Sequence, residues 1–218
     1  HKSGVQLDMV ITNKYYVNSE GTAYRRPETL VTLSAHGVGQ AKDGQKLKHF
    51  VPFIAKRPDG LPSEKAMAAA IKKMADELTG LIAAPVMDTY QGPVIFTGQA
   101  TAELFSQLMV PHFSGKRPPV SENSRMSMMN PESKLARKIG RKVLPTFLSV
   151  TDDPTIKDYN KQSLFGGYAI DAEGVPPQPV KLVEKGKLKT LLMSRRPRKE
   201  ISNSNGHARS GMMGKGGV

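Results

Sequence analysis

Cysteine and tryptophan are absent from this chain of 218 residues, and aromatic residues make up only 6% of it. Without cysteine the chain can form no disulfide, no thiolate zinc site and no cysteine nucleophile. It also lacks any run of about 18 apolar residues, which a membrane-spanning helix would need. The opening residues, His1 to Gly4, have no apolar core of a signal peptide. Because the chain opens on histidine and not on methionine, we expect a processed protein or a fragment, whose upstream targeting sequence would not be visible.

Acidic residues are scarce: 19 Asp and Glu stand against 32 Lys and Arg, a formal net charge of +13. Most of the excess lies in 111–142, with eight basic and two acidic residues, and in 195–218, with six and one. Such a balance makes anionic partners worth considering. Phe113 is the only aromatic residue in these two segments, so a platform for stacking bases is missing. We therefore expect a solvated or substrate-steering surface and disfavour nucleic acid as a partner.

The first 55 residues have the pattern of an antiparallel sheet. Apolar residues alternate there with polar ones, which is the period of a half-buried strand. Strands are predicted at 5–11, 15–17, 29–35 and 47–54, with a turn at 18–21 and a loop through Gly37, Gly39 and Gly44. A helix follows, because Ser63 is a good N-cap, apolar residues repeat at helical spacing, and Gly80 is a natural stop. Its simplest role is to cover one face of the sheet.

The pattern changes near 84–91, where we place a domain boundary. It separates an α+β subdomain, 1–85, from a β-rich C-terminal-type subdomain, 86–218, which is expected to contain one strand-helix unit and basic loops. In the second subdomain we predict a strand at 93–96, helices at 98–110 and 132–142, strands at 146–150, 167–170, 180–183 and 188–193, and turns at 171–174 and 185–186. The aperiodic connection 111–130 is typical of a functional or disordered segment. The predicted fold class is α+β, with antiparallel sheets and a few covering helices.

Two positions are candidates for chemistry. No two of the five histidines are close enough in sequence for a local zinc motif. His207 lies among small polar residues that would let a ligand approach the backbone, although the same composition also suits a plain solvated loop. Asp152 and Asp153 could bind a cation or share a proton, but adjacent acids in a strand point to opposite faces. The following Pro154 favours a turn or a helix start instead.

Five blocks of the sequence, taken in order, resemble the TldD/PmbA family. They are Tyr16-Val17-Asn18-Ser19-Glu20-Gly21, the block from Tyr90 to Ala100, Asp152-Asp153-Pro154-Thr155, the block from Asp171 to Gln178, and Ser204-Asn205-Gly206-His207-Ala208-Arg209. The resemblance spans almost the whole chain. Because members of the family are about twice this length, it implies that the chain is a middle and C-terminal portion.

The resemblance implies a cytoplasmic zinc-dependent peptidase, historically a modulator of DNA gyrase, in a paired assembly in which one subunit type carries the metal. The family's metal-binding subunit has the motif His-Glu-x-x-x-His, where two imidazoles hold zinc and the glutamate activates its water. Here Ala102 and Gln107 occupy the two ligand positions, and only Glu103 matches. The family's third ligand, a cysteine, is also missing. The chain therefore resembles the PmbA-like type without metal, for which we expect no cofactor of its own.

Three functional hypotheses follow. The first is a non-catalytic subunit that binds extended polypeptide at its sheet edges and assembles as a homo-oligomer or with a zinc-carrying TldD-like subunit. Its candidate substrate-binding residues are Gln107, Ser204, Asn205, His207 and Arg209, although Gln107 and Glu103 would also suit an ordinary wet helix face. The second is an active hydrolase that combines Glu103 with His207. The third is a basic module that binds nucleic acid or gyrase.

Overall fold

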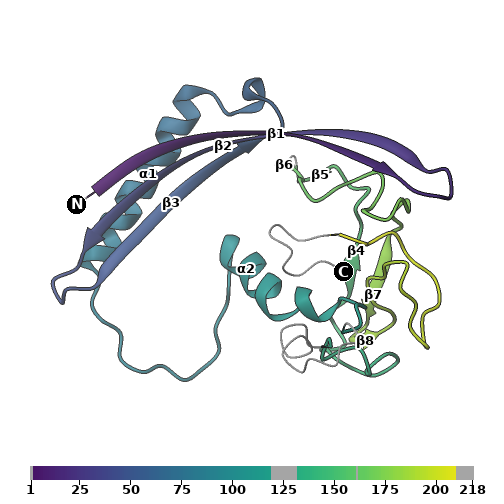
Figure 1. Cartoon of the computed structure of the whole chain (residues 1–218). Coiled ribbons are helices and arrows are strands. Elements are labelled where there is room, and N and C mark those ends of the chain that lie inside the picture. The colour runs from purple at the N-terminus through teal and green to yellow at the C-terminus, as the bar shows by residue number, and fades with distance from the viewer. Residues whose placement is uncertain (1, 119–131, 161, 210–218) are drawn as a thin grey trace. The chain divides into compact units, whose positions relative to one another are not determined.

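The computed structural model describes residues 2–118, 132–160 and 162–209. The chain divides into two compact units, His1–Pro93 and Val94–Val218. The first unit contains one sheet and the second unit contains two, and the colours of Figure 1 follow the chain through them. The fold is α+β with antiparallel sheets, as the sequence predicts.

The first unit is built on three long antiparallel strands in the order β1-β2-β3 (Figure 1). They are β1 (Lys2–Val17), β2 (Ala23–Gln40) and β3 (Lys46–Ala55). The prediction of separate strands at 5–11 and 15–17 is wrong, because β1 pairs with β2 in one unbroken register. The polar residues between the two predicted strands have partners on β2: Lys14 Nζ lies 2.9 Å from Glu28 Oε2, and Asn13 accepts hydrogen bonds from Arg25.

The glycines Gly37 and Gly39 lie inside β2, so the predicted glycine-rich loop is wrong at these two positions. A methyl group at Gly37 would come within 2.8 Å of Leu78 Cδ2 on the helix above. Glycine is used here because it lets the helix approach the strand, and the turn itself is confined to the residues after Gln40.

Helix α1 (Glu64–Ala83) packs on β2 and β3 and buries Met74 and Leu78. The predicted cap is confirmed, since the Ser63 hydroxyl accepts a hydrogen bond from the Ala66 N–H at 3.3 Å. The predicted stop at Gly80 is wrong. One glycine costs an exposed helix about 1 kcal/mol, which the packed face of α1 outweighs. Among the described residues, no helix is long and apolar enough to cross a membrane.

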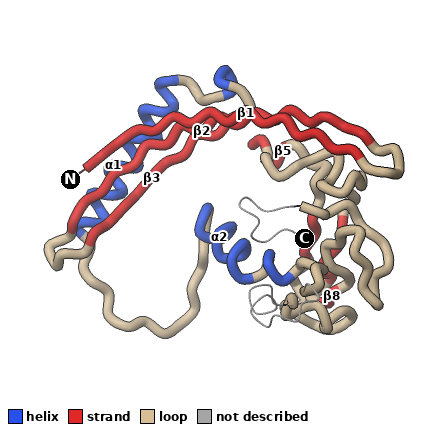
Figure 2. Tube along the Cα trace, in the orientation of Figure 1, coloured by secondary structure: helices blue, strands red, loops and turns tan. Residues whose placement is uncertain are grey.

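The second unit consists mainly of loops and turns, shown in tan in Figure 2. Its helices are α2 (Gln99–Leu108) and a 3-10 turn, Val110–His112. Its strands are β4 (Val150–Asp152), β5 (Asp158–Tyr159), β6 (Gln162–Ser163), β7 (Val180–Glu184) and β8 (Lys187–Leu188), in sheets of order β4-β7-β8 and β5-β6.

Several strands predicted in this unit are absent or much shorter. The segments 93–96 and 167–170 form no strand, and only Val150 of the segment 146–150 is in β4. After Leu188 the run 188–193 leaves the sheet, although Leu191 and Met193 are completely buried. Its backbone bonds to scattered partners, such as the Phe113 carbonyl for the Leu192 N–H. The apolar run therefore reports burial in the core and not strand structure.

The basic segment 132–142 is a series of turns, so the predicted helix is wrong. The turns are closed by local bonds, such as that from the Ala136 N–H to the Ser133 carbonyl. The end of the segment pairs with β8, where the Gly140 N–H donates to the Leu188 carbonyl and the Leu188 N–H donates to the Arg141 carbonyl. At this end, bonds to another strand take the place of the bonds along the chain that a continuing helix would need. Part of the aperiodic connection 111–130 lies outside the described residues.

A buried arginine ties three parts of the second unit together. The Arg198 side chain is only 7% exposed, and it donates to the Gly115 carbonyl at 3.2 Å and to Glu132 Oε1 at 2.6 Å. The hydrogen bond from the guanidinium lowers the pKa of the Glu132 carboxyl, with burial opposing. Because the folded pKa is depressed, the pair stabilises the fold above the unfolded carboxyl pKa, and this contribution is lost as pH falls through the folded value.

Replacing Glu132 by glutamine is expected to lower the free energy of unfolding by about 2 kcal/mol at neutral pH, because the charge on Arg198 loses its hydrogen-bonded partner. The deficit should shrink as pH falls through the depressed pKa of the folded carboxyl, where the wild-type side chain also becomes protonated. Urea unfolding at a series of pH values measures this difference. Glu200→Gln is the control, since that carboxylate is half exposed and lies 3.9 Å from Arg198. A deficit that is the same at every pH would contradict the assignment.

Candidate functional site

Helix α2 contains Ala102, Glu103 and Gln107, the positions that correspond to the zinc motif of the family. The Gln107 side-chain amide donates to Glu103 Oε1 at 2.5 Å, one helical turn away, and both side chains are exposed. Ala102 offers only a methyl group. Neither the alanine nor the engaged amide fits a zinc ion, which takes imidazole, thiolate or carboxylate ligands. Among the described residues, no three His, Asp or Glu side chains are grouped so that they could hold a metal ion.

His207 is buried, with only 3% of its surface exposed, and both of its ring nitrogens are engaged. Its Nε2 lies 3.0 Å from Asp152 Oδ1, and its Nδ1 lies 2.8 Å and 3.0 Å from the backbone and side-chain oxygens of Asn205. The interpretation of this segment as a solvated loop is therefore wrong. With these contacts, His207 acts as an internal tie between the end of β4 and the segment 204–209.

The orientation of the Asn205 amide follows from its own neighbours. Its Oδ1 accepts from the Met193 N–H at 2.7 Å, and its Nδ2 donates to the Leu191 carbonyl at 2.9 Å. His207 Nδ1 consequently faces two acceptor oxygens, so it is the donor in this contact. The other ring nitrogen, Nε2, faces the Asp152 carboxylate. Ser204 is engaged in a similar way, since its hydroxyl donates to the Met193 carbonyl and accepts from the Gly206 N–H.

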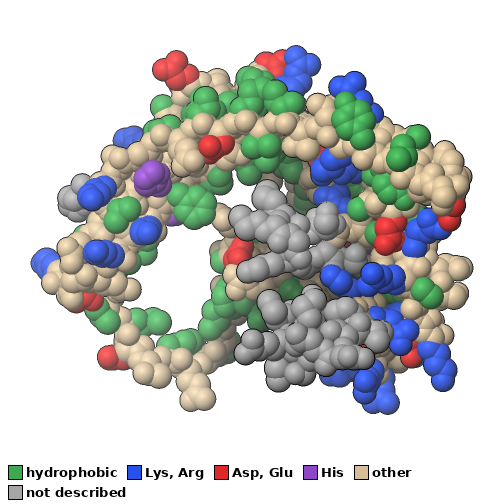
Figure 3. Space-filling model, in the orientation of Figure 1, with side chains coloured by type: hydrophobic (Ala, Val, Ile, Leu, Met, Phe, Trp, Pro, Cys, Tyr) green, Lys and Arg blue, Asp and Glu red, His purple; other side chains and the backbone are tan. Residues whose placement is uncertain are grey.

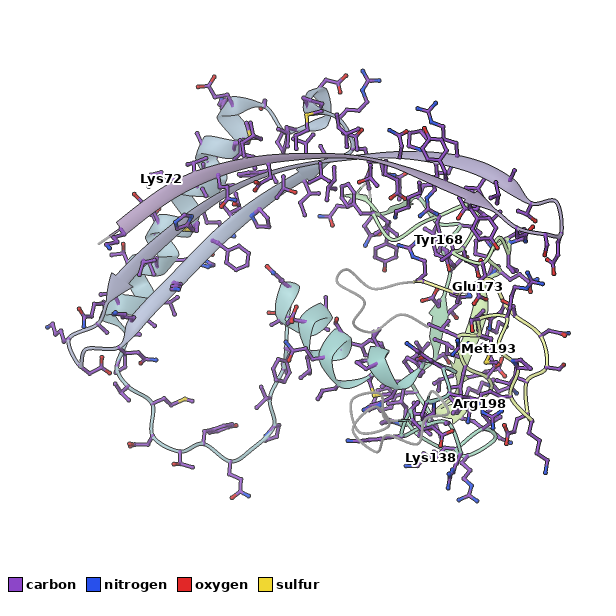
Figure 4. All side chains as sticks on the ribbon, in the orientation of Figure 1. Lys72, Lys138, Tyr168, Glu173, Met193 and Arg198 are labelled. Atoms are coloured by element: carbon purple, nitrogen blue, oxygen red, sulfur yellow. The ribbon has the colours of Figure 1, made fainter. Side chains whose placement is uncertain are left out.

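Tyr168 completes this arrangement and is absent from the residues predicted by sequence. Its hydroxyl donates to the Gly206 carbonyl at 2.8 Å, and its ring meets the His207 ring edge-on, with centroids 6.3 Å apart. The guanidinium carbon of Arg209 lies 4.4 Å from the centre of the same ring, a cation-π contact. Figure 4 labels Tyr168 within the second unit. We call Asp152, Tyr168, Asn205, His207 and Arg209 the His207 cluster.

The Asp171 side chain also holds the segment 204–209 in place. Its carboxylate is fully buried, and Oδ1 accepts from the N–H groups of Glu173 and Val175 at 2.9 Å and 2.8 Å. Its Oδ2 accepts from the Ala208 N–H at 3.0 Å. The predicted turn at 171–174 is confirmed. An aspartate at the start of a turn is a sequence signal for the first two bonds, whereas the bond to Ala208 depends on the tertiary fold.

The two adjacent acids at the end of β4 have separate partners. Asp152 faces His207, while Asp153 Oδ1 accepts from the Thr155 N–H and hydroxyl at 2.9 Å and 2.6 Å. The interpretation of Asp153 as a turn residue is confirmed, and the two acids have different hydrogen-bond partners. His207 and Glu103 are not hydrogen-bonded to each other in the described structure. Of the predicted binding residues, Ser204, Asn205 and His207 form hydrogen bonds within the segment 204–209 and to its neighbours. Gln107 is exposed, and Arg209 is partly buried.

Comparison with protein families matches residues 89–218 of the chain. The matching family is described as the PmbA/TldA metallopeptidase C-terminal domain. Among curated proteins, a metalloprotease of Methanothermobacter thermautotrophicus is 39% identical over 80 residues, which is 36% of this chain and 16% of that protein.

Solved structures share the fold. A protein of Thermotoga maritima described as a candidate modulator of a DNA gyrase superimposes with a TM-score of 0.69 and 23% identity, covering 95% of this chain and 44% of that one. TldE from Thermococcus kodakarensis gives a TM-score of 0.57 and 20% identity, covering 99% of this chain and 43% of that one. The chain thus spans less than half the length of these relatives.

Proposed function

Because the chain belongs to the PmbA/TldD family, we propose that it works in a peptide-processing system as a non-catalytic part that binds extended polypeptide. The family match covers the whole of the second unit, which holds the candidate binding residues. A zinc-carrying TldD-like subunit would supply the cleavage, and the assembly would act in the cytoplasm.

The observation that carries this proposal is the hydrogen bond between Gln107 and Glu103. In a zinc peptidase the glutamate of the motif acts on a water whose pKa the metal has lowered. Glu103 instead accepts a hydrogen bond from an amide that stands where an imidazole would be required. A carboxylate in this state can accept hydrogen bonds from a bound chain, but it has no activated water to use.

Arg209 is the strongest candidate for contact with the polypeptide. Its guanidinium carbon lies 4.4 Å from the centre of the Tyr168 ring, and the residue is partly buried but still reaches the surface. Guanidinium groups donate to the backbone carbonyls and carboxylates of a peptide, and a group that is already ordered loses less entropy on binding. The buried contacts of the His207 cluster and of Asp171 keep the backbone beneath this side chain in place.

A paired measurement tests the proposal. The purified protein is expected to leave unfolded polypeptides uncleaved and to bind a fluorescent unstructured peptide, with about tenfold weaker binding for Arg209→Gln. Arg57→Gln, which changes an exposed arginine of the first unit, is the control and should bind normally. One tightly bound zinc per chain, removed by a chelator together with peptidase activity that Glu103→Gln also abolishes, would overturn the proposal.

A further inference from the structure

Positive charge is concentrated where the segment 138–142 meets the β7–β8 hairpin of the second unit. The ranges 138–142 and 181–189 contain seven basic residues and one acidic residue, Glu184, and all eight are exposed. Figure 3 shows Lys and Arg side chains, in blue, at the lower right over this part of the second unit. We call the seven basic residues the basic surface: Lys138, Arg141, Lys142, Lys181, Lys185, Lys187 and Lys189.

The backbone brings two of these lysines side by side. Lys142 and Lys187 form an antiparallel bridge, and the backbone hydrogen bonds between the flanking residues lie on either side of it, at 2.8 Å and 2.9 Å. In this kind of pair the two residues are not hydrogen-bonded to each other, and their side chains come closer together than in the other kind. Like charges directly opposite each other are unfavourable. An anion bound between the two ammonium groups would relieve this repulsion.

The fold supplies little negative charge to this surface. Glu184 is shared, with its carboxylate oxygens 3.4 Å from Lys189 Nζ and 3.9 Å from Lys181 Nζ. Within the described ranges, the other five residues of the basic surface form no ion pair. Glu132, on the same series of turns as Lys138, is already hydrogen-bonded to Arg198. Lysine is almost never fully buried without a partner, so this surface is expected to face solvent in a longer protein as well.

We infer that the basic surface binds an acidic stretch of polypeptide, in which several Asp or Glu side chains follow one another in an extended chain. The inference rests on the proposed function and names a class of substrate for it: polypeptides that carry such a stretch beside the part held by Arg209. The acidic side chains would take the place of the missing internal partners of the lysines, Lys142 and Lys187 above all.

The composition of the basic surface favours carboxylates over nucleic acid. Arginine matches phosphate best through its planar fork, but six of the seven basic residues are lysines. The ranges 138–142 and 181–189 contain no aromatic residue. Phe147, near the β7–β8 turn, offers one exposed ring, whereas the stacking of successive bases uses several. A polypeptide needs no such platform.

One peptide is long enough to contact both the basic surface and Arg209. After Lys189 the chain continues to Met193, whose N–H and carbonyl are hydrogen-bonded to the side chains of Asn205 and Ser204. Because each residue spans at most about 3.5 Å, the path from Lys189 through Met193 to Arg209 measures at most about 35 Å. An extended peptide of about ten residues covers a similar distance.

Two fluorescent unstructured peptides of equal length test the inference. One carries about six aspartates beside a neutral stretch of about ten residues, and the other has asparagine in place of each aspartate. Because each exposed ion pair strengthens binding about twofold and about four can form, the protein should bind the acidic peptide about tenfold more tightly at low salt. The difference should largely disappear at about 1 M salt, where the Debye length is about 3 Å.

A pair of double variants locates the effect. Lys142→Gln with Lys187→Gln should weaken binding of the acidic peptide about fourfold and leave binding of the asparagine peptide unchanged, which also shows that the variant is folded. Lys46→Gln with Lys48→Gln is the matched control. It removes two exposed lysines from alternate positions of β3, with the same change in net charge, and should bind both peptides normally.

The outcomes separate this inference from the proposed function. Equal binding of the two peptides by the wild type, or equal losses in the two double variants, would overturn the inference and leave the proposed function standing. Failure to bind either peptide would overturn both. A single-stranded oligonucleotide of the same charge that binds more tightly than the acidic peptide, and loses affinity in the variant of Lys142 and Lys187, would assign the surface to nucleic acid and overturn the inference.

Discussion

The variant Asp171→Ala is expected to lose about 5 kcal/mol of unfolding free energy in the second unit. The carboxylate is fully buried and accepts hydrogen bonds from three backbone N–H groups, those of Glu173, Val175 and Ala208. Alanine would leave all three donors without the acceptor that the fold provides. Because the third bond joins the turn to the segment 204–209, the damage should spread to the His207 cluster.

Hydrogen exchange separates this effect from a general loss of structure. The Ala208 amide should exchange much faster in Asp171→Ala, and also in Asp171→Asn, where the amide NH₂ would face the Ala208 N–H donor to donor. Asp158→Ala is the control: that aspartate is exposed and accepts from the Ser163 hydroxyl at 2.9 Å, so its loss should cost about 1 kcal/mol or less. If Asp171→Ala proved as mild as the control, the anchoring role of Asp171 would be wrong.

The variant Gly206→Ala is expected to destabilise the second unit by about 4 kcal/mol. Gly206 has φ of 76°, a left-handed conformation that costs other residues about 1 to 2 kcal/mol. An added methyl group would also come within 2.5 Å of Pro177 Cα and collide with the Pro176 carbonyl oxygen. Both neighbours are backbone atoms, so the clash can be relieved only by moving one chain segment away from the other.

Gly140→Ala provides the comparison that isolates the clash. Gly140 belongs to the same unit and has φ of 83°, but a methyl group there would meet nothing within 4 Å. It should therefore cost only the conformational penalty of about 1 kcal/mol. Urea unfolding, followed through exchange of the buried Leu192 amide, measures both variants. Similar losses for the two glycines would contradict the close packing of Gly206 on the segment 176–177.

The elements that could be predicted from sequence are those decided by neighbours in the chain. Helix α1 has its cap, its apolar period and its polar face within twenty residues, and the turns at 171–174 and 185–186 are likewise local. The first sheet is also close to local, because each strand pairs with the next along the chain. The predictions that are wrong in this sheet concern where a strand ends or whether it continues, as at Gly37 and Gly39 inside β2.

In the second unit, predictions from local sequence patterns are wrong for the strand at 188–193 and the helix at 132–142. The run 188–193 is apolar because Leu191 and Met193 fill the core, and apolar residues alone do not distinguish a buried loop from a strand. The segment 132–142 has a helical composition, yet its backbone forms short local turns, and at its end Gly140 and Arg141 bond to Leu188 of β8. Short loops can be buried in this way only if distant groups satisfy their backbone.

The sequence by itself determined the α+β class, the family resemblance and the replacement of the zinc-ligand positions by Ala102 and Gln107, because each depends only on which residues stand in which order. Only the tertiary structure decided what His207 does. Its partners Asp152 and Tyr168 lie 55 and 39 positions earlier in the chain. The hydrogen bond to the first, at 3.0 Å, and the edge-on ring contact with the second both depend on how the fold brings distant segments together. The segment 204–209 has the composition of a solvated loop, but His207 and Ala208 are buried in it and bond to Asp152 and Asp171.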